Sequence, residues 1–464
     1  MHHGENMKKT INAFTGFLAI LFIITTGANA GTARPSGMQH NILTLADAIK
    51  NAMAYSPELK AAVFGEKTAE HDLGRAKAGF MPQINFTETF SRTDAPMWAF
   101  ATLLNQGRIQ SKDFNPSSLN DPDGINNFNS LISISMPVYA GGRISGSIRQ
   151  ADINTKIAAL AHEKTRQAVI ARTALAYTGL LLAEKNLQVV MHALESAKAN
   201  LNMVKAGYKN GFSVKSDLLR AKVRIACLEQ QRLDAENKIQ IAKGYLNSAM
   251  GVQPETHVDV IEYFDKNSRQ INISGRDLIS RAIKKRPELQ ILALQKQIAE
   301  QGIKIAEADN LPSVNLFGTY ENNCEDFGDS HNNYSIGAAM QINLFSGFAS
   351  KHRIKSARYT LDRIRQLEKN MRLAVKVQVR ETWLNLTTSW KRIQVARSAL
   401  DQAQENLRIV KNRYKNGLLT IVSLLDAELS DQKARADHFR AVYDYESARI
   451  RLALVSGVIN SDFK

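Results

Sequence analysis

The sequence has little cysteine, and beyond its first residues it lacks an apolar run of membrane length. Only two of its 464 residues are cysteine, Cys227 and Cys324, which excludes a fold held together by a disulfide framework. Charged residues interrupt every helical pattern after residue 30, and mean hydropathy is −0.26. We therefore expect no transmembrane helix in that part of the chain.

The sequence also lacks the motifs of the common enzyme classes. It contains no glycine-rich phosphate loop, no nucleophile elbow and no His/Cys cluster with metal-ligand spacing. The histidines from residue 71 onward are scattered, at His71, His162, His192, His257, His331, His352 and His438. We expect no enzymatic activity, no cofactor and no metal site.

Acidic residues are scarcer than basic ones, 44 against 60, and the formal net charge is +16. A basic excess can indicate nucleic-acid binding. Here Lys and Arg alternate with Glu and Asp along helical patterns, and no block of five or six basic residues stands alone. The charge therefore favours solvated helix faces, and we expect no nucleic-acid partner.

Residues 1–30 have the pattern of a secretory signal peptide. Lys8 and Lys9 precede an apolar stretch at 11–25, and Ala28-Asn29-Ala30 is an A-x-A cleavage pattern. A membrane anchor is the alternative, but the apolar stretch is short for a bilayer span of about 20 residues. No cysteine follows the cleavage pattern, so lipidation is not supported. We expect an exported chain.

The remaining chain carries an internal duplication. The matching residues are Pro57 and Pro287, Pro82 and Pro312, and the Tyr-Lys-Asn-Gly segments at 208–211 and 414–417. Both proline pairs are 230 residues apart, and the two Tyr-Lys-Asn-Gly segments are 206 apart. Repetition of this kind predicts two copies of one structural unit. We divide the sequence into a first repeat at 31–252, a linker at 253–273, a second repeat at 274–459 and a tail at 460–464.

Each repeat contains an expected strand hairpin, at 82–139 and 312–345. Apolar and polar residues alternate in both, and the apolar members include Ile84, Phe86, Phe90, Ile132, Ile134, Met136, Val314, Leu316, Tyr320, Ile336 and Met340. Strands of roughly ten residues suit a tilted crossing of a bilayer. A half-buried soluble sheet alternates in the same way, so the strands alone leave both interpretations open. Polar loops are expected at 93–128 and 322–333.

A pair of long helices follows each hairpin, at 144–250 and 348–455. The stretch from Ile144 to Tyr208 contains no proline, and as one helix it would be about 100 Å long. Its apolar residues form heptads, at Ala176, Leu180, Ala183, Leu187, Val190, Leu194, Ala197, Leu201 and Val204. The pattern recurs at Leu386, Ile393, Ala396, Leu400, Ala403, Leu407 and Val410. Sustained heptads favour coiled-coil packing over an ordinary globular bundle.

Four strands are too few to close a barrel in a membrane. The smallest spanning barrels use about eight strands, and an open sheet edge is not tolerated in lipid. If the strands are membranous, three chains supply twelve strands with pseudo-sixfold symmetry. The sequence then predicts an α+β membrane protein, a trimeric 12-stranded β-barrel that continues into a long α-helical coiled-coil barrel.

Several short motifs, in this order and spacing, resemble the TolC-like outer-membrane efflux proteins over about residues 43–459. They are the Ser/Arg-Pro-Glu-Leu segments at 56–59 and 286–289, the strand starts at 81–85 and 311–315, Met-Pro-Val-Tyr-Ala-Gly-Gly at 136–142, Ile-Asn-Leu-Phe-Ser-Gly at 342–347, the two Tyr-x-x-Gly turns, and the stretch 418–427. The resemblance implies a homotrimeric outer-membrane channel of a Gram-negative cell that extends into the periplasm. It would be the passive conduit of a tripartite export system, working with a periplasmic adaptor (a membrane fusion protein) and an inner-membrane transporter of the RND or ABC type, and would carry drugs or secreted proteins.

The same resemblance assigns a gate to the periplasmic tip, where the long helices turn. By this resemblance Asp217, Tyr414 and Asp426 would be gate residues, and the Tyr414 phenol would form a hydrogen bond with the Asp217 carboxylate. The adaptor-docking turns would be Tyr208, Asn210, Gly211, Asn416 and Gly417. Leu419 stands where the family pattern has an arginine, and Ser423 where it has a second acidic residue, which implies a weaker latch.

An adaptor or structural protein of the periplasm, built on coiled coils but without a pore, is the alternative. It explains the leader and the long helices. It does not explain four alternating strands of bilayer length.

Overall fold

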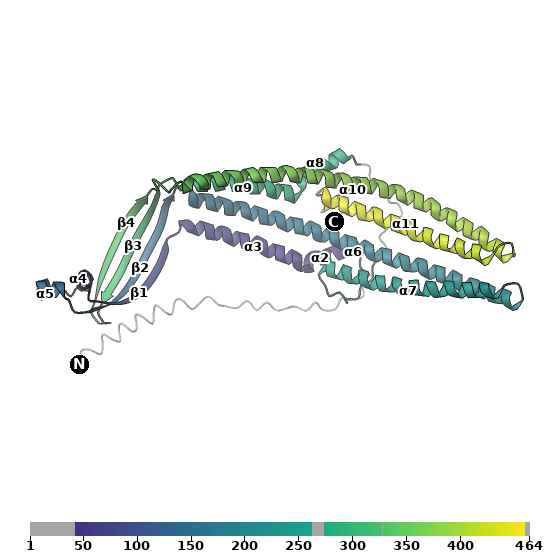
Figure 1. Ribbon diagram of the computed structural model, residues 1–464, viewed down its shortest axis with the longest axis horizontal. Coiled ribbons are helices and arrows are strands. Elements are labelled where there is room, and N and C mark those ends of the chain that lie inside the picture. The colour runs from purple at the N-terminus through teal and green to yellow at the C-terminus, as the bar shows by residue number, and fades with distance from the viewer. Residues whose placement is uncertain (1–41, 262–272, 327, 460–464) are drawn as a thin grey trace. The chain divides into compact units, whose positions relative to one another are not determined.

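The computed structural model describes residues 42–261, 273–326 and 328–459 (Figure 1). The expected leader at 1–30, most of the linker at 253–273 and the tail at 460–464 lie outside the described residues. The described chain forms two compact units. The sheet unit comprises Gly74–Ile148 and Gly302–Lys355, and the helical unit comprises residues up to Leu73, Arg149–Gln301 and residues from Ser356 onward.

The sheet unit is built on four antiparallel strands in the order β1-β2-β3-β4. They are β1 (Gln83–Thr93), β2 (Ile125–Ala140), β3 (Ser313–Cys324) and β4 (Ser330–Gln341). The two expected hairpins are present, and β2 also pairs with β3 along most of its length. The only shift in that register falls between Pro137 and Tyr139, where proline has no N–H to donate to the ladder. The two repeats therefore share one continuous sheet.

The loops are shorter than the sequence pattern predicts, and the second hairpin was predicted too long at its end, because β4 stops at Gln341 and not at 345. The loop expected at 93–128 is wrong in two ways: β2 begins at Ile125, and the connection contains α4 (Pro96–Asn105), the 3₁₀ turn η2 (Ser111–Phe114) and α5 (Pro116–Asn120). The loop expected at 322–333 is reduced to 325–329, and Cys324 ends β3 instead of lying in a loop. Asparagine has low strand propensity, but pairing with neighbouring strands overrides that preference here.

The helical unit is dominated by four long helices. They are α6 (Arg143–Lys209) and α7 (Lys215–Met250), then α10 (Ala349–Lys415) and α11 (Ile421–Val455), and the first few residues of α6 and α10 belong to the sheet unit. These bounds agree with the expected helices to within about a residue. Both α6 and α10 have 67 residues, as the duplication predicts. Every heptad residue predicted on α6 and α10 is buried or half-buried, so the expected seam faces other helices.

Shorter helices precede the strands in both repeats. They are α2 (Leu45–Tyr55), α3 (Pro57–Lys77) with the 3₁₀ turn η1 (Ala78–Phe80), α8 (Gly275–Lys285) and α9 (Pro287–Ala308). Thr44 caps α2, because its hydroxyl accepts the Asp47 backbone N–H at 3.1 Å. Pro57 and Pro287 each occupy the first helical position, where a missing N–H costs nothing.

Two apolar clusters form the core of the helical unit. In the first, Tyr177 of α6 is fully buried, and its hydroxyl lies 2.9 Å from the Leu43 carbonyl oxygen and 2.7 Å from that of Ile261. Burial raises the pKa of Tyr177 to about 12, so the phenol stays protonated and holds the segments before α2 and after α7. The second cluster joins α8, α9, α10 and α11, and in it the Trp390 and Tyr445 rings lie 5.2 Å apart. Within the described ranges, no helix has the length and apolar character of a bilayer span.

Candidate functional site

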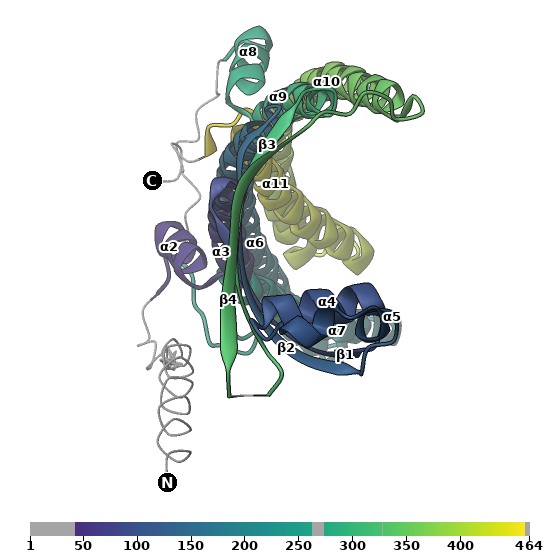
Figure 2. The same ribbon diagram turned by 90° about the vertical axis from the view of Figure 1, so that its left-hand side faces the viewer.

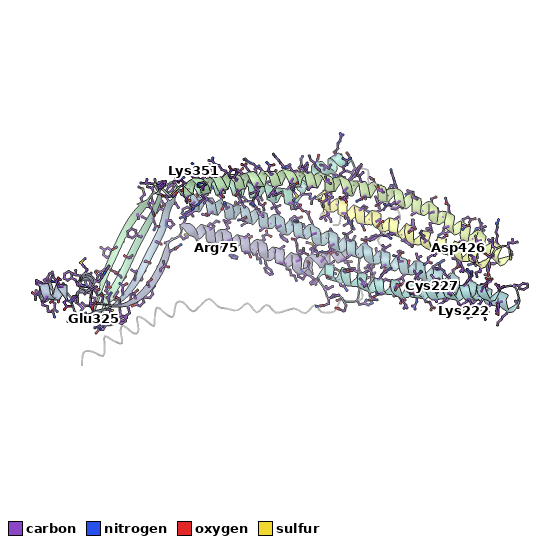
Figure 3. The ribbon with its side chains drawn as sticks, in the orientation of Figure 1. Arg75, Lys222, Cys227, Glu325, Lys351 and Asp426 are labelled. Atoms are coloured by element: carbon purple, nitrogen blue, oxygen red, sulfur yellow. The ribbon has the colours of Figure 1, made fainter. Side chains whose placement is uncertain are left out.

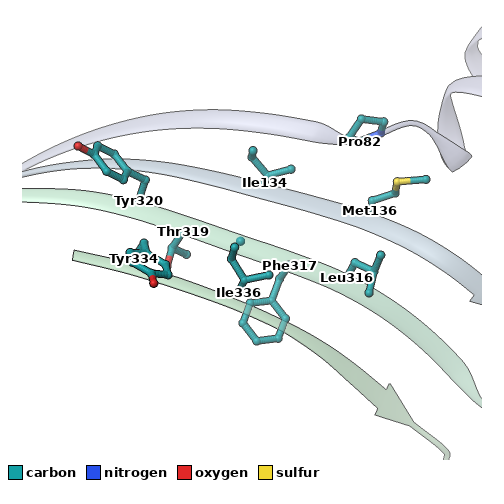
Figure 4. A pocket seen from close by; sticks show the side chains of 10 residues that line it. Pro82, Ile134, Met136, Leu316, Phe317, Thr319, Tyr320, Tyr334 and Ile336 are labelled. Carbon is teal, nitrogen blue, oxygen red and sulfur yellow. The ribbon is translucent and has the colours of Figure 1, made fainter. Parts of the chain in front are cut away.

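One face of the sheet is a continuous apolar surface. Because the strands are in register, side chains form rows across all four. One row is Phe86, Ile132, Tyr320 and Tyr334, the next is Ile84, Ile134, Gly318 and Ile336, and the next contains Met136, Leu316 and Ala338. Figure 4 shows several of these side chains on neighbouring strands. Most of the large ones are exposed in the single chain. An exposed apolar surface of this extent indicates a hydrophobic environment or partner.

A polar row interrupts the apolar surface, and one row further along the same face the Phe90 and Phe128 rings lie 4.8 Å apart. The row beyond Phe86 and Tyr320 consists of Glu88, Ser130, Asn322 and Asn332, all polar. Aromatic residues therefore stand at the boundary between apolar and polar rows. From Val314 to Tyr320 the apolar surface covers four rows of β3, about 20 Å at the rise of a strand. That height approaches the apolar band of about 25 Å on membrane barrels.

The opposite face of the sheet is polar. Its rows include Asn85, Ser133, Thr319 and Ser335, then Thr87, Leu131, Glu321 and Asn333, then Thr89, Asn129, Asn323 and His331. Among the described residues, β1 and β4 each pair on one side only, which leaves two open edges. A sheet with one apolar face, one polar face and open edges is suited to joining further strands.

The second candidate region lies where the long helices turn. Gly211 and Gly417 both have positive φ, +78° and +73°, which glycine adopts without steric cost. The backbone N–H of Gly211 donates to the Tyr208 carbonyl at 3.3 Å, and that of Gly417 donates to the Tyr414 carbonyl at 3.0 Å. The two turns are therefore equivalent, as the repeated Tyr-Lys-Asn-Gly segment predicts.

Each turn also presents an apolar side chain that the sequence analysis did not single out. Phe212 is 88% exposed, and Leu418, which is 206 residues later, is 70% exposed. The sequence could have predicted them, because both apolar residues directly follow the glycine of a repeated turn. An exposed apolar residue at an equivalent place in both repeats indicates a contact surface at the turns.

A small apolar cluster brings the two turn regions together, and we name it the helix-turn cluster. Its buried members are Val204, Ala221 and Ile421, surrounded by Leu201, Leu218, Tyr414 and Leu425. Tyr414 is hydrogen-bonded to the Ser213 hydroxyl in the other turn. Burial, and then the nearby Asp217 carboxylate, raise the pKa of Tyr414, so the phenol stays protonated. The structure thus gives the Tyr414 hydroxyl Ser213 as its hydrogen-bond partner, where the resemblance predicts the Asp217 carboxylate, and Asp217 acts on the phenol through its charge.

The remaining predicted residues of this region are not gathered in the helix-turn cluster. Asp426 is exposed on α11 (Figure 3), and Tyr208 is exposed at the end of α6. The Ser423 hydroxyl lies 3.4 Å from the Thr420 hydroxyl, beside the turn. Gly207 leaves room for the Ser213 side chain, because a Cβ added at Gly207 would lie 2.6 Å from the Ser213 hydroxyl oxygen. No sequence signal predicted this packing.

A buried polar group between α6 and α11 was also missed. Glu428 accepts hydrogen bonds from the Ser196 hydroxyl, at 2.9 Å, and from the Asn200 amide. Burial raises its pKa, while its hydrogen bonds to Ser196 and Asn200 and the charges of Arg224 and Lys411 act in the opposite sense. Four buried residues of α11 follow helical spacing, at Ile421, Leu424, Glu428 and Asp431. The sequence signal for this buried polar group was the presence of two acidic residues on an otherwise apolar helix face.

Nearby contacts extend this junction between the repeats. Arg224 of α7 donates to the Gln432 side chain of α11 at 2.6 Å, and the Gln432 amide donates to the Gln231 side chain of α7 at 2.9 Å. Buried polar contacts of this kind fix the register of packed helices, because a shift would leave charged groups without partners.

Comparison with known proteins agrees with this arrangement. The chain matches the family model described as outer membrane efflux protein over residues 48–252 and 278–458. Protein CyaE of Bordetella pertussis is 24% identical over 425 residues, which cover 89% of this chain and 84% of CyaE. Outer membrane protein TolC of Vibrio cholerae is 24% identical over 427 residues, which cover 90% of this chain and 91% of TolC.

Solved structures share the fold. The outer membrane protein VceC from Vibrio cholerae aligns with a TM-score of 0.73 at 18% identity, covering 89% of this chain and 96% of VceC. The CmeC outer membrane channel of Campylobacter jejuni aligns with a TM-score of 0.77 at 17% identity, covering 89% of this chain and 86% of CmeC.

An apolar-faced sheet with open edges, joined in the sequence to duplicated long helices, defines the class of outer-membrane channel subunits. This chain belongs to the outer membrane efflux protein family. It is a channel of the outer membrane that serves an export system. The alternative of a pore-free periplasmic adaptor is therefore wrong.

Proposed function

We propose that three copies of this chain assemble into one channel with a shared 12-stranded β-barrel, and that the apolar sheet face contacts outer-membrane lipid. The open edges of β1 and β4 carry the proposal. An unpaired strand edge in lipid leaves backbone groups without hydrogen bonds, so each edge requires a partner strand. Pairing β1 of one copy with β4 of the next gives the backbone groups of every edge strand a hydrogen-bonding partner. The polar face then lines the lumen.

Exposed apolar residues on α10 support the same assembly. Leu373, Val377, Leu384, Val395 and Ile409 are exposed in the single chain and fall on one helical stripe, which we name the α10 stripe. Helix α7 carries a second exposed stripe, at Leu219, Val223, Leu233, Ile241 and Tyr245. Within the chain, α6 contacts α11. Packing of α10 against α7 of the next copy would continue the ring of helices and bury both stripes.

The assembled helices would form a passive periplasmic tunnel with its gate at the helix-turn cluster. The contact between Tyr414 and Ser213, beside Asp217, joins the two turns of one chain and is weak enough for a docked partner to displace. One buried hydrogen bond contributes about 1 kcal/mol. Asp426 would narrow the entrance from its exposed position on α11. Leu419 and Ser423 stand where the family pattern has an arginine and an acidic residue, and the loss of these charges favours a weak latch.

The partners would be a periplasmic adaptor and an inner-membrane transporter of the RND or ABC type. The adaptor would dock on the turns at Tyr208, Asn210, Gly211, Asn416 and Gly417, where Phe212 and Leu418 offer apolar contacts. Relatives are named for protease secretion and for pyoverdine export, so secreted proteins and small molecules are both candidate cargo. Cross-linking followed by pull-down and mass spectrometry would identify the adaptor and the transporter.

The assembly is tested by membrane fractionation and by the mass of the purified protein. We expect the protein to fractionate with outer membranes and to require detergent. Native mass spectrometry should give three chains, and electrophoresis should show an oligomer that becomes a monomer only on heating. A water-soluble monomer without affinity for detergent would contradict the proposal.

A further inference from the structure

The connection between β1 and β2 is a folded segment at the ends of the strands, on the side of the polar face (Figure 1). Figure 2 shows α4 and α5 on the concave side of the curved strands. Ala99 of α4 is fully buried, and the rings of Phe100 and Phe114 make an edge-to-face contact at 5.7 Å between centroids. We name residues 94–124 the cover segment. Its counterpart between β3 and β4 is the short connection at 325–329.

Gln106, at the end of α4, ties the cover segment to the sheet. Its side chain is 4% exposed, and its amide donates to the Asn126 carbonyl at 2.8 Å and to the Asn127 side chain at 2.9 Å. The Asn127 amide donates in turn to the Asn323 side-chain oxygen at 2.9 Å, and Asn129 donates to the same oxygen at 3.0 Å. The cover segment thus continues a hydrogen-bonded network of the polar face.

Further contacts reach β4 and the second connection. The Asn333 side chain donates to the Asn105 carbonyl at 3.3 Å, and Arg108 pairs with Glu325 at 2.5 Å. Gly107 has φ +67°, and a Cβ built there would lie 3.5 Å from the His331 Cβ. The cover segment therefore spans from β2 across to β4, and glycine permits the close approach.

The two faces of α4 differ. Ala99, Leu103 and Gln106 follow the spacing of one helical face, and Ala99 and Gln106 are buried. Met97, Ala101 and Leu104 share the opposite face, where Met97 is among the most exposed apolar side chains of the molecule. A helix fixed by one face and apolar on the other points its free face away from the wall to which it is tied.

We propose that the cover segment lies inside the outer mouth of the channel and limits the size of molecule that can pass, with the three copies of α4 presenting their Met97 faces to one another across the opening. The inference rests on the proposed barrel, in which the polar concave face is the lumen. One cover per chain gives three around the mouth. The ties through Gln106 and Arg108 hold each cover in place until a large cargo displaces it. The mouth is then a second constriction, separate from the helix-turn cluster.

The test measures entry from outside, so that the state of the periplasmic gate does not affect it. Cys227 and Cys324 are replaced by Ser and Ala, and Thr319→Cys places one thiol on the polar face, deeper than the Asn323–His331 row. Intact cells are treated with a small methanethiosulfonate reagent or with a maleimide on a polyethylene glycol of several kilodaltons. In the otherwise native chain we expect the small reagent to label the thiol and the large one to label it slowly.

Gln106→Ala should raise the rate of labelling by the large reagent about tenfold, which corresponds to about 1.4 kcal/mol, with little change for the small one. Replacing residues 96–121 by a short Gly/Ser linker should raise it further. Lys112→Ala, at an exposed position of the same segment, is the matched control and should change neither rate. Equal rates of labelling by the large reagent in all variants would contradict the proposal that the cover segment limits passage. A thiol that the small reagent cannot reach would overturn the barrel as well.

A second variant does not depend on removing the segment. Gly107→Cys with His331→Cys, in the same cysteine-free background without Thr319→Cys, places two Cβ atoms at a separation that a disulfide accepts. We expect the bond to form in the assembled protein, as a mobility shift that reductant reverses. Failure of this disulfide to form in a properly assembled trimer would also overturn the cover.

Discussion

The helices α6 and α10 have equal length and the same heptad pattern, yet their environments differ. Val377 of α10 is 66% exposed, whereas Ala171, at the equivalent place 206 residues earlier, is 3% exposed. Val395 and Val189 differ in the same way, at 71% and 5%. Helix α6 has neighbours from both repeats within the chain, while α10 lacks a neighbour on its α10 stripe. The difference indicates where another copy of the chain completes the packing.

The largest effect is expected from charging the α10 stripe. Val377→Asp combined with Val395→Asp should prevent trimer formation, because each change removes an apolar contact of about 1.5–3 kcal/mol and buries a charge in the assembly. Both positions are exposed in the single chain, so its helical content should be unchanged. Native mass spectrometry and circular dichroism would measure the two properties.

Val377→Leu is the matched control, since it keeps the position apolar and should keep three chains together. A stable trimer with both aspartates would show that α10 faces solvent, and the comparison with α6 would then have no bearing on assembly.

The next prediction uses the two turn tyrosines, which share a motif but not an environment. Tyr414→Phe removes the hydrogen bond to Ser213 and should raise the open fraction of the channel several-fold, as expected for about 1 kcal/mol. Tyr208→Phe, at an exposed position, should leave it unchanged. Single-channel conductance in planar bilayers would measure both.

Asp217→Ala removes the carboxylate whose charge acts on Tyr414 and should also loosen the closed state. If Tyr414→Phe and Asp217→Ala both conduct as the native protein does, the helix-turn cluster is not the gate.

The smallest effect is expected from Glu428, whose counterpart 206 residues earlier is the exposed Lys222 (Figure 3). Because burial raises the folded-state pKa of Glu428 above 4.5, the native state binds the proton more tightly than the unfolded state. The free energy of unfolding contributed by this group is highest below about pH 4.5 and falls as the pH rises through the folded-state pKa. Above that window, ionised Glu428 weakens the junction between α6 and α11.

Glu428→Gln should therefore remove this pH dependence and raise the midpoint of thermal unfolding at neutral pH, as measured by calorimetry between pH 4 and 8. Glu229→Gln, at an exposed position of α7, serves as the control and should keep the native slope. An unchanged slope in Glu428→Gln would show that this carboxylate does not couple the two repeats to pH.

Much of the fold was predictable because its signals are local and repeated. Proline marks the starts of α3 and α9, at Pro57 and Pro287, and glycine marks the turns after α6 and α10, at Gly211 and Gly417. The absence of proline from Ile144 to Tyr208 predicts one uninterrupted long helix. The strands were predicted less well. Asparagine-rich ends such as 322–324 carry no strand propensity, and they extend the sheet only because neighbouring strands supply the hydrogen bonds.

The candidate sites divide in the same way. The resemblance pointed to Tyr414 and Asp217, but the hydrogen-bond partner of Tyr414 is Ser213, and no motif marks Ser213 or Gly207. Glu428 reads as one more charged residue in a charged helix, and its burial depends on α6 of the other repeat. The cover segment is hidden for the same reason, because its ties to Asn127 and Asn333 join residues far apart in the sequence.

The sequence by itself determined the duplication, the four long helices and the strand pairs, because periodicity, caps and turn residues act over a few neighbouring positions. Only the tertiary structure decided that the two hairpins form one sheet, that the first connection folds across the polar face, and that α10 remains exposed where α6 is buried. These features depend on which distant segments share hydrogen bonds and apolar contacts, and no local pattern specifies that choice.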